Sequence, residues 1–265
     1  MATIHPSAVV SPGAQLADSV EVGPMCFIGP NVKIGAHTRL LGQCHITGHT
    51  EIGEGNTIYP FATIGTLGQD FHASEKTLSY VRIGDGNIFR EASTVHAGTE
   101  EGTETVIGSN CMFMNCAHVG HNVKVGNGVI LVSSSVLGGH SQVMDHAILS
   151  GLVAVHQFCK VGRYVMLSGG SVFSKDIPPF MMAEGRNGGL KMVNVIGMQR
   201  AGFSQESIRA IRDVFKIFVR SGLNISNALA KIKSDVPQLP EVLEFIEFCE
   251  TSKRGVLCSR EGHRD

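Results

Sequence analysis

The stretch IGSNCMFMNCAHVGHNVKV, residues 107–125, has an apolar residue at every sixth position: Ile107, Phe113, Val119 and Val125. Neither an α-helix nor a β-strand has this period, because their side chains repeat every 3.6 and 2 residues. A chain that turns a corner every six residues, and points one aliphatic side chain inward each time, forms a triangular parallel β-helix. Three such steps, about 18 residues, complete one coil.

The same period covers most of residues 4–173. It runs from Ile4 to Ile64, restarts at Ile83, and continues from Ile107 to Phe173. Glycine often follows the apolar residue, and we expect it to ease the bend at each corner. Two interruptions, near 66–82 and 97–105, predict loops that leave the prism, and such loops often carry binding residues.

The pattern changes after Phe173. Segment 175–189, KDIPPFMMAEGRNGG, has the composition of turns. A helical period then predicts a helix capped by Ser204 and ended by Gly222, a second over 226–232, and a third beginning near Pro240. We therefore expect a mainly β protein, with a β-helix over 1–177 and a linker and helical domain over 178–265.

The composition argues against several classes of protein. The net charge is −1 and charged residues make up 17% of the chain, which excludes a global field for nucleic acid. The seven cysteines are scattered without a CxxC pair, as in a protein with free thiols in a reducing cytosol. The N-terminus lacks the features of a signal peptide, and no long apolar run predicts a membrane span.

His118 and His121 flank the inward-facing Val119, so we expect both outside the core. Steps of about 18 residues from His121 end within one residue of His140 and His156, which predicts a column of three histidines on one corner. The column could bind a metal, arise by chance, or act on a substrate as a general base with helpers. Few further metal ligands are in phase with it, which favours catalysis.

A base requires a partner for the negative charge that develops on a substrate. Gly138 and Gly139, in LGGH (137–140), allow backbone N–H groups to approach a reacting carbonyl. No serine or cysteine has the setting of a nucleophile. Direct attack by a hydroxyl or amine of the substrate is therefore expected.

Several segments closely resemble the UDP-N-acetylglucosamine O-acyltransferases, the hexapeptide-repeat family that begins lipid A synthesis. They are NCAHVGH (115–121), LGGH (137–140), AVHQFCKVG (154–162), QD (69–70), VNVIGMQRAGFS (193–204) and TSKRGV (251–256). The similarity extends over essentially the whole chain. It implies a left-handed parallel β-helix and a cytoplasmic homotrimer, with active sites between neighbouring prisms.

The resemblance also implies a mechanism. His121 would deprotonate the 3-hydroxyl of UDP-N-acetylglucosamine, which attacks the thioester of a (3R)-3-hydroxyacyl-acyl carrier protein. Gly139 N–H would bind the oxyanion, with Asn122 beside the base. The acyl carrier protein is a co-substrate, and the family uses no metal and no other cofactor.

Further residues match the substrate-binding positions of the family. The expected sugar, phosphate and loop contacts are Asp70, His72, His118, His140, His156 and Gln157. Asn194 and Arg200 match uridine contacts, and Gly169 matches the residue that measures acyl length, where glycine leaves a deep groove. Arg209, Arg212, Lys216 and Arg220 share one helix face, which either is simply solvated or, as the resemblance favours, docks the acidic acyl carrier protein.

Four positions depart from the pattern of the family: Asn122 stands for Asp, His72 for Lys, Ile196 for Glu and Ala201 for Arg. The loss of Asp matters most, because a carboxylate orients the imidazole and stabilises its protonated form. The alternatives are a slower acyltransferase, a paralogue that acts on another nucleotide such as an amino sugar, and a non-catalytic binding protein. A zinc enzyme of the γ-carbonic anhydrase type is a further alternative.

Overall fold

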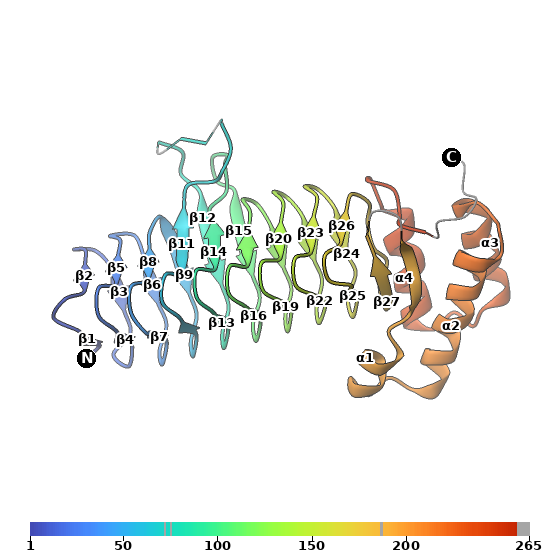
Figure 1. Cartoon of the computed structure of the whole chain (residues 1–265), viewed down its shortest axis with the longest axis horizontal. Coiled ribbons are helices and arrows are strands. Elements are labelled where there is room, and N and C mark those ends of the chain that lie inside the picture. The colour runs from blue at the N-terminus through green and yellow to red at the C-terminus, as the bar shows by residue number, and fades with distance from the viewer. Residues whose placement is uncertain (72, 75, 186–187, 259–265) are drawn as a thin grey trace.

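The structure, a computed structural model, describes residues 1–71, 73–74, 76–185 and 188–258. Three sheets run along a prism, and each coil of the chain adds one short strand to each sheet (Figure 1). The prism ends in a helical region that packs against its last coils (Figure 1). The mainly β fold predicted from the six-residue period is confirmed.

The first sheet consists of β1 (Thr3–Ile4), β4 (Glu21–Val22), β7 (Arg39–Leu40), β10 (Thr57–Ile58), β13 (Ile88–Phe89), β16 (Met112–Phe113), β19 (Ile130–Leu131), β22 (Ile148–Leu149), β25 (Met166–Leu167), β27 (Met181–Glu184) and β28 (Gly189–Val193). The second consists of β2 (Val9–Val10), β5 (Phe27–Ile28), β8 (His45–Ile46), β11 (Thr63–Thr66), β14 (Thr94–His96), β17 (His118–Val119), β20 (Val136–Leu137), β23 (Ala154–Val155) and β26 (Val172–Phe173). The third consists of β3 (Gln15–Leu16), β6 (Lys33–Ile34), β9 (His49–Ile52), β12 (Tyr80–Ile83), β15 (Glu104–Ile107), β18 (Lys124–Val125), β21 (Gln142–Val143) and β24 (Lys160–Val161).

Strand pairing is parallel and keeps the apolar positions in register. Val119 pairs with Leu137 and Leu137 with Val155, each 18 residues further along. Val95 pairs with Val119 at a longer separation, because the chain between them includes a loop. One loop, residues 67–79, lies between β11 and β12, and a second, residues 97–103, lies between β14 and β15.

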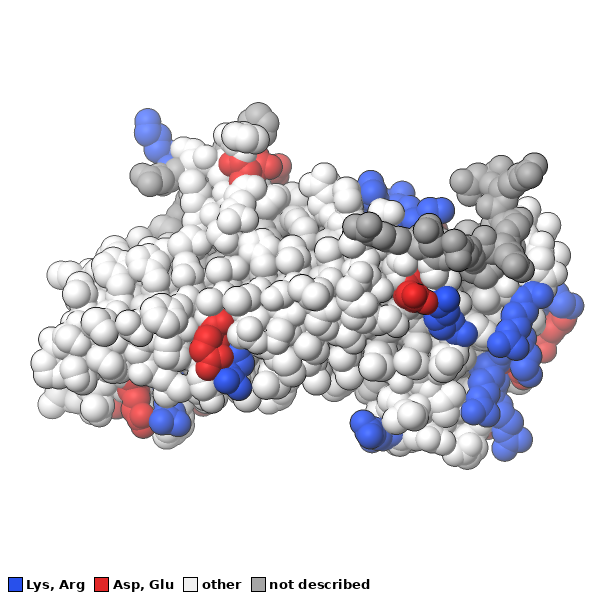
Figure 2. Space-filling model, in the orientation of Figure 1, with Lys and Arg blue, Asp and Glu red and all other residues white. Residues whose placement is uncertain are grey.

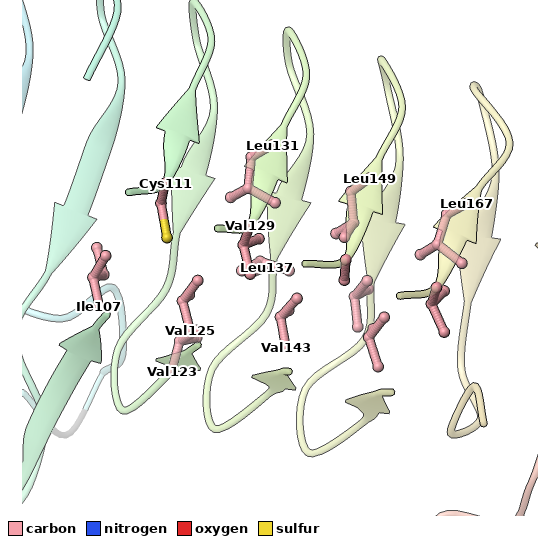
Figure 3. Packing of buried hydrophobic residues seen from close by; sticks show 14 of the residues in the cluster. Ile107, Cys111, Val123, Val125, Val129, Leu131, Leu137, Val143, Leu149 and Leu167 are labelled. Atoms are coloured by element: carbon pink, nitrogen blue, oxygen red, sulfur yellow. The ribbon is translucent and has the colours of Figure 1, made fainter. Parts of the chain in front are cut away.

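The every-sixth side chains form a continuous apolar column inside the prism. Val119, Leu137 and Val155 are at most 2% exposed, and Figure 3 shows Val125 and Val143 on successive coils below Leu131 and Leu149. Burial of each such side chain contributes about 1.5–3 kcal/mol to folding. The first coil is an exception, since Ile4 is 44% exposed at the open end.

The corners are formed differently from the prediction that glycine eases the bend. Left-handed backbone occurs three residues after the apolar position, at Asn122 (φ 60°), His140 (φ 58°) and their equivalents on other coils. Gly120 is not among the positive-φ residues. A Cβ on Gly120 would lie 2.7 Å from the carbonyl oxygen of Leu137, so this glycine permits close approach of two coils.

The prediction of turns for 175–189 is wrong in part. β27 extends the first sheet in parallel with β25, and β28 returns antiparallel to β27. The apolar side chains of PFMM are buried between the prism and the helices, and this tertiary burial favours a strand where local composition favours a turn.

The helical region contains α1 (Val195–Arg200), α2 (Gln205–Arg220), α3 (Ile225–Asp235) and α4 (Pro240–Glu250). Ser204 caps α2 as predicted, because its Oγ accepts a hydrogen bond from Ser207 N. α3 begins earlier and ends later than the predicted 226–232, since Asn224 provides its cap. α1 was not predicted: its six residues are too few to show a helical period.

Two contacts attach this region to the prism. Arg163 Nε donates to the Glu244 carboxylate on α4 at 2.6 Å. The buried Asp176 carboxylate accepts from Lys160 N and from Ser252 Oγ. The segment after α4 therefore lies along the last coils.

Candidate active site

His121 lies at the corner between the second and third sheets, in the turn that joins β17 to β18. The turn residue Asn122 has left-handed backbone, a conformation that asparagine tolerates better than most residues. Asn122 N–H donates to Thr105 Oγ1 of β15 at 2.8 Å. The β-helix therefore positions the His121–Asn122 pair through its neighbouring coil.

The imidazole of His121 has a partner on each side. Its Nδ1 lies 2.9 Å from Asn122 Oδ1. The same oxygen accepts from Thr99 N–H at 3.2 Å and from Thr99 Oγ1 at 3.1 Å. With Nδ1–H donating to Asn122, the lone pair of Nε2 is available as a base.

Gly139, on the next coil, lies directly against this Nε2. A Cβ at position 139 would overlap Nε2 and Cε1 of His121, so only glycine fits beside the ring. The N–H groups of Gly138 and His140 donate to Val155 O and His121 O, whereas within the described part of the chain Gly139 N–H donates to no backbone carbonyl. A backbone donor without such a partner therefore lies next to the base.

His118 lies on β17 and is half-buried. Its Nδ1 is 2.8 Å from Thr94 Oγ1, and its ring is 5.2 Å from the ring of His96. Burial lowers the pKa of His118 to about 4, and the nearby His96 and His121 lower it further. His118 is therefore neutral near pH 7, and it offers one donor and one acceptor.

The predicted column of His121, His140 and His156 is wrong at its third member. The rings of His121 and His140 are 5.1 Å apart, but His140 stacks on Phe158 at 4.7 Å. His156 lies on the coil beside Gly138 and faces Arg254, and its Nδ1 is 3.1 Å from Gln157 O. The one-residue offset between these positions in the repeat changes the direction in which each side chain points.

The environment of His140 also includes two carboxylates. Burial lowers the pKa of His140, as does His121, whereas Glu100 and Asp70 act to raise it. Asp70 belongs to the loop 67–79 and Glu100 to the loop 97–103. Both loops that leave the prism therefore reach this corner.

The other predicted residues occupy varied positions. His156 and Gln157 are exposed next to the corner, and His72 lies outside the described residues. Gly169 is exposed in the turn between β25 and β26, where a Cβ would lie 3.2 Å from Gly151 O. The space around Gly169 therefore accepts little more than glycine on that side.

A pocket of about 750 Å³ opens beside Asn122 and His140, and it has a basic rim. The cations on this rim are Lys124, Lys160, Lys253 and Arg254. No ion pair joins any of them to a carboxylate in the ranges that the structure describes. The sequence prediction missed this rim, although Lys124 and Lys160 are two coils apart and Lys253 and Arg254 belong to TSKRGV.

Asn194 and Arg200 are not brought together with His121. They line a separate groove of about 720 Å³, which shares no residue with the pocket beside Asn122. Asn194 Oδ1 accepts from Gly197 N and caps α1, while its Nδ2 donates to Tyr164 O. The buried amide therefore has a structural role in this chain.

The basic face of α2 is present as predicted in the sequence. Arg209, Arg212, Lys216 and Arg220 are all exposed, and Figure 2 shows cationic side chains gathered over the helical end of the molecule. Arg212, Lys216 and Arg220 border the groove that contains Arg200, whose floor includes Ile148 and Met166. Lys216 also pairs with Asp213 at 2.8 Å.

Two searches of the described residues concern metals and membranes. No three side chains of His, Cys, Asp or Glu in those ranges converge as a metal site requires. Among the helices described, none has the length and apolar character needed to cross a bilayer.

Comparison with known proteins adds a family to this geometry. The family model described as UDP-N-acetylglucosamine O-acyltransferase, domain 2, matches residues 176–257. The bacterial transferase hexapeptide model matches residues 31–66 and 104–139. The two models therefore match both the helical region and the repeats of the prism.

Individual relatives match the chain along almost its full length. The acyl-[acyl-carrier-protein]–UDP-N-acetylglucosamine O-acyltransferase of Anaeromyxobacter sp. is 42% identical, over 96% of this chain and 98% of the relative. The UDP-N-acetylglucosamine acyltransferase structure from Bacteroides fragilis is 40% identical, with a TM-score of 0.91 and coverage of 96% and 99%. That from Francisella novicida is 37% identical, with a TM-score of 0.93 and coverage of 97% and 94%.

Proposed function

We infer the function from the family, since the chain belongs to the acyl-[acyl-carrier-protein]–UDP-N-acetylglucosamine O-acyltransferases, one of which is 42% identical over 96% of its length. It is a UDP-N-acetylglucosamine acyltransferase, the enzyme of the first step of lipid A synthesis. One observation connects this activity to the geometry: His121 Nε2 faces Gly139, whose N–H has no backbone acceptor among the described residues.

The proposed reaction uses direct attack. His121 Nε2 takes the proton of the sugar 3-hydroxyl as its oxygen attacks the thioester carbonyl carbon. Gly139 N–H donates to the oxyanion of the tetrahedral intermediate. The C–S bond then breaks, and the thiolate of the carrier protein takes the proton from the imidazolium, which restores the neutral base.

The remaining residues of the corner are proposed to bind the co-substrates. Neutral His118 and His140 offer hydrogen bonds to sugar hydroxyls, with Asp70, His156 and Gln157 at the edge. His72 belongs to the same proposed set. The basic rim formed by Lys124, Lys160, Lys253 and Arg254 suits a phosphate group carried by either co-substrate.

A homotrimer is proposed because two halves of the expected site are separate in one chain. Asn194 and Arg200 line a groove distinct from the pocket beside His121. Docking of the groove of one prism against the histidine corner of its neighbour would complete the site. The apolar floor of the groove, including Ile148 and Met166, supports this contact.

Two further proposals concern the acyl donor. The cationic face of α2 is proposed to dock the acidic acyl carrier protein, and the missing side chain at Gly169 to admit a long hydroxyacyl chain. We place the reaction in the cytoplasm, which suits the free cysteines.

Asn122 favours one alternative, a homologue that binds the nucleotide without turnover. An acyl-transfer assay with (3R)-3-hydroxyacyl-acyl carrier protein and UDP-N-acetylglucosamine separates the two functions. Wild type is expected to form product, and His121→Ala to lose about 10²–10⁴ in rate. Binding of the nucleotide without any product from wild type or Asn122→Asp would support the alternative.

A further inference from the structure

The side chain of Asn122 can face His121 in two ways that have opposite chemical effects. If Oδ1 faces the ring, Nδ1 must donate and Nε2 keeps its lone pair. If Nδ2 faces the ring, Nδ1 must accept, the proton moves to Nε2, and the base loses its lone pair. A carboxylate at this position would have no such second state, because both of its oxygens accept.

Thr99 makes the contact that distinguishes the two states. Its backbone N–H lies 3.2 Å from Asn122 Oδ1, and its Oγ1 lies 3.1 Å from the same atom. A backbone N–H can only donate, so it requires the oxygen of the amide and opposes the amide nitrogen. The hydroxyl adds a second donor to that oxygen.

Thr99 is itself held in place by the two loops. Gly68 of the loop 67–79 is buried, and a Cβ there would lie 2.5 Å from Thr99 Cγ2 and 3.0 Å from His121 Cβ. The backbone of Asn122 is anchored separately by its hydrogen bond to Thr105. The amide is thus fixed at its backbone by one strand and at its oxygen by one loop.

We propose that Thr99 is a positioning residue that locks the amide of Asn122, so that His121 carries its proton on Nδ1 and keeps Nε2 free. The inference rests on the proposed function, in which His121 is the base. It gives the loop 97–103 a role in the chemistry, and it explains how the site functions without a carboxylate beside the imidazole.

The test is the tautomer of His121, measured by NMR of ¹⁵N-histidine-labelled full-length protein at about pH 8, where histidines are mostly neutral. Wild type is expected to show Nδ1–H, and Thr99→Val, which removes the hydroxyl alone, a population of Nε2–H. Thr99→Ser keeps the hydroxyl and is expected to keep the wild-type tautomer. Thr103→Val is the control, because Thr103 Oγ1 bonds only within its own loop, to Glu100 O and N.

Activity provides a second measurement. Thr99→Val is expected to lower kcat about threefold to tenfold, the range for one hydrogen bond, with KM for the nucleotide nearly unchanged. In the Asn122→Asp background the same substitution is expected to have less effect, because a carboxylate has no wrong orientation. Thr99→Ala serves if the valine variant does not fold.

Two results would overturn the proposal. One is an unchanged His121 tautomer in Thr99→Val. The other is an equal loss of kcat in both backgrounds, as a purely structural role of the loop would produce. If wild type transfers no acyl group at all, the proposed function fails, while the tautomer measurement still decides the role of Thr99.

Discussion

At the residue scale, the site depends on the absence of a side chain at Gly139. Its position against His121 Nε2 leaves no room for a methyl group, yet its backbone is not among the left-handed positions. We expect Gly139→Ala to fold and to turn the imidazole away from its Asn122 partner, with a fall in kcat of about 10²–10³. Steady-state kinetics and thermal unfolding measure the two effects separately.

Gly151→Ala is the matched control, because a Cβ there would make an ordinary contact of 3.5 Å with Ser133 O. It should leave kcat close to wild type. Equal rates for the two alanine variants would show that the close approach of Gly139 to His121 has no importance for catalysis.

His118 predicts a dependence of stability on pH. Its pKa in the folded chain is about 4, below the ordinary value of 6.5, so the unfolded chain binds more protons between these values. The free energy of unfolding should therefore rise with pH through this window, and this contribution is lost as pH falls. Urea unfolding at several pH values should show a shallower rise for His118→Asn, and parallel curves would contradict the assignment.

At the scale of elements, the third sheet aligns cations along one edge of the site. Lys124 on β18 and Lys160 on β24 border the same pocket with β21 between them. If they bind a phosphate, Lys124→Ala and Lys160→Ala should each raise KM for one co-substrate by about tenfold while kcat changes little. Separate titrations of the nucleotide and of the acyl donor identify which co-substrate carries that phosphate.

Lys33→Ala is the control on the same sheet. Lys33 lies on β6, several coils from the pocket, and pairs with Glu51 at 2.9 Å. A rise in KM as large as that of the pocket variants would indicate a general loss of positive charge, and it would contradict a local phosphate site.

At the scale of the whole molecule, the proposed trimer predicts complementation. His121→Ala and Arg200→Ala should each be nearly inactive. When they are co-expressed, about a quarter of the sites between random neighbours would contain both intact residues. Activity of the mixed protein measures this recovery.

A matched pair tests the geometry of that sharing. His118→Ala and His121→Ala both alter the same corner of one prism, so their mixture should recover nothing. Recovery in this control, or none with Arg200→Ala, would place the parts of the site in a different arrangement.

The prism could be predicted from the sequence because its period is repeated on every coil, and each inward residue is read independently. The position of the His121–Gly139 pair followed from the same count. The path of His156 did not, since a one-residue offset at a corner reverses the direction of a side chain. Thr99 and the hairpin β27–β28 also could not be predicted, because loop contacts and burial against α-helices leave no periodic signal.

The open first coil has a consequence for the order in which the protein is made. Ile4 is exposed at 44%, while Phe173 near the helices is 2% exposed, so the coil without a neighbour is also the first to leave the ribosome. The helical region that covers the other end is translated last. Each newly synthesised coil therefore waits for the following one before its apolar face is covered, and chaperone demand should persist until α4 has emerged.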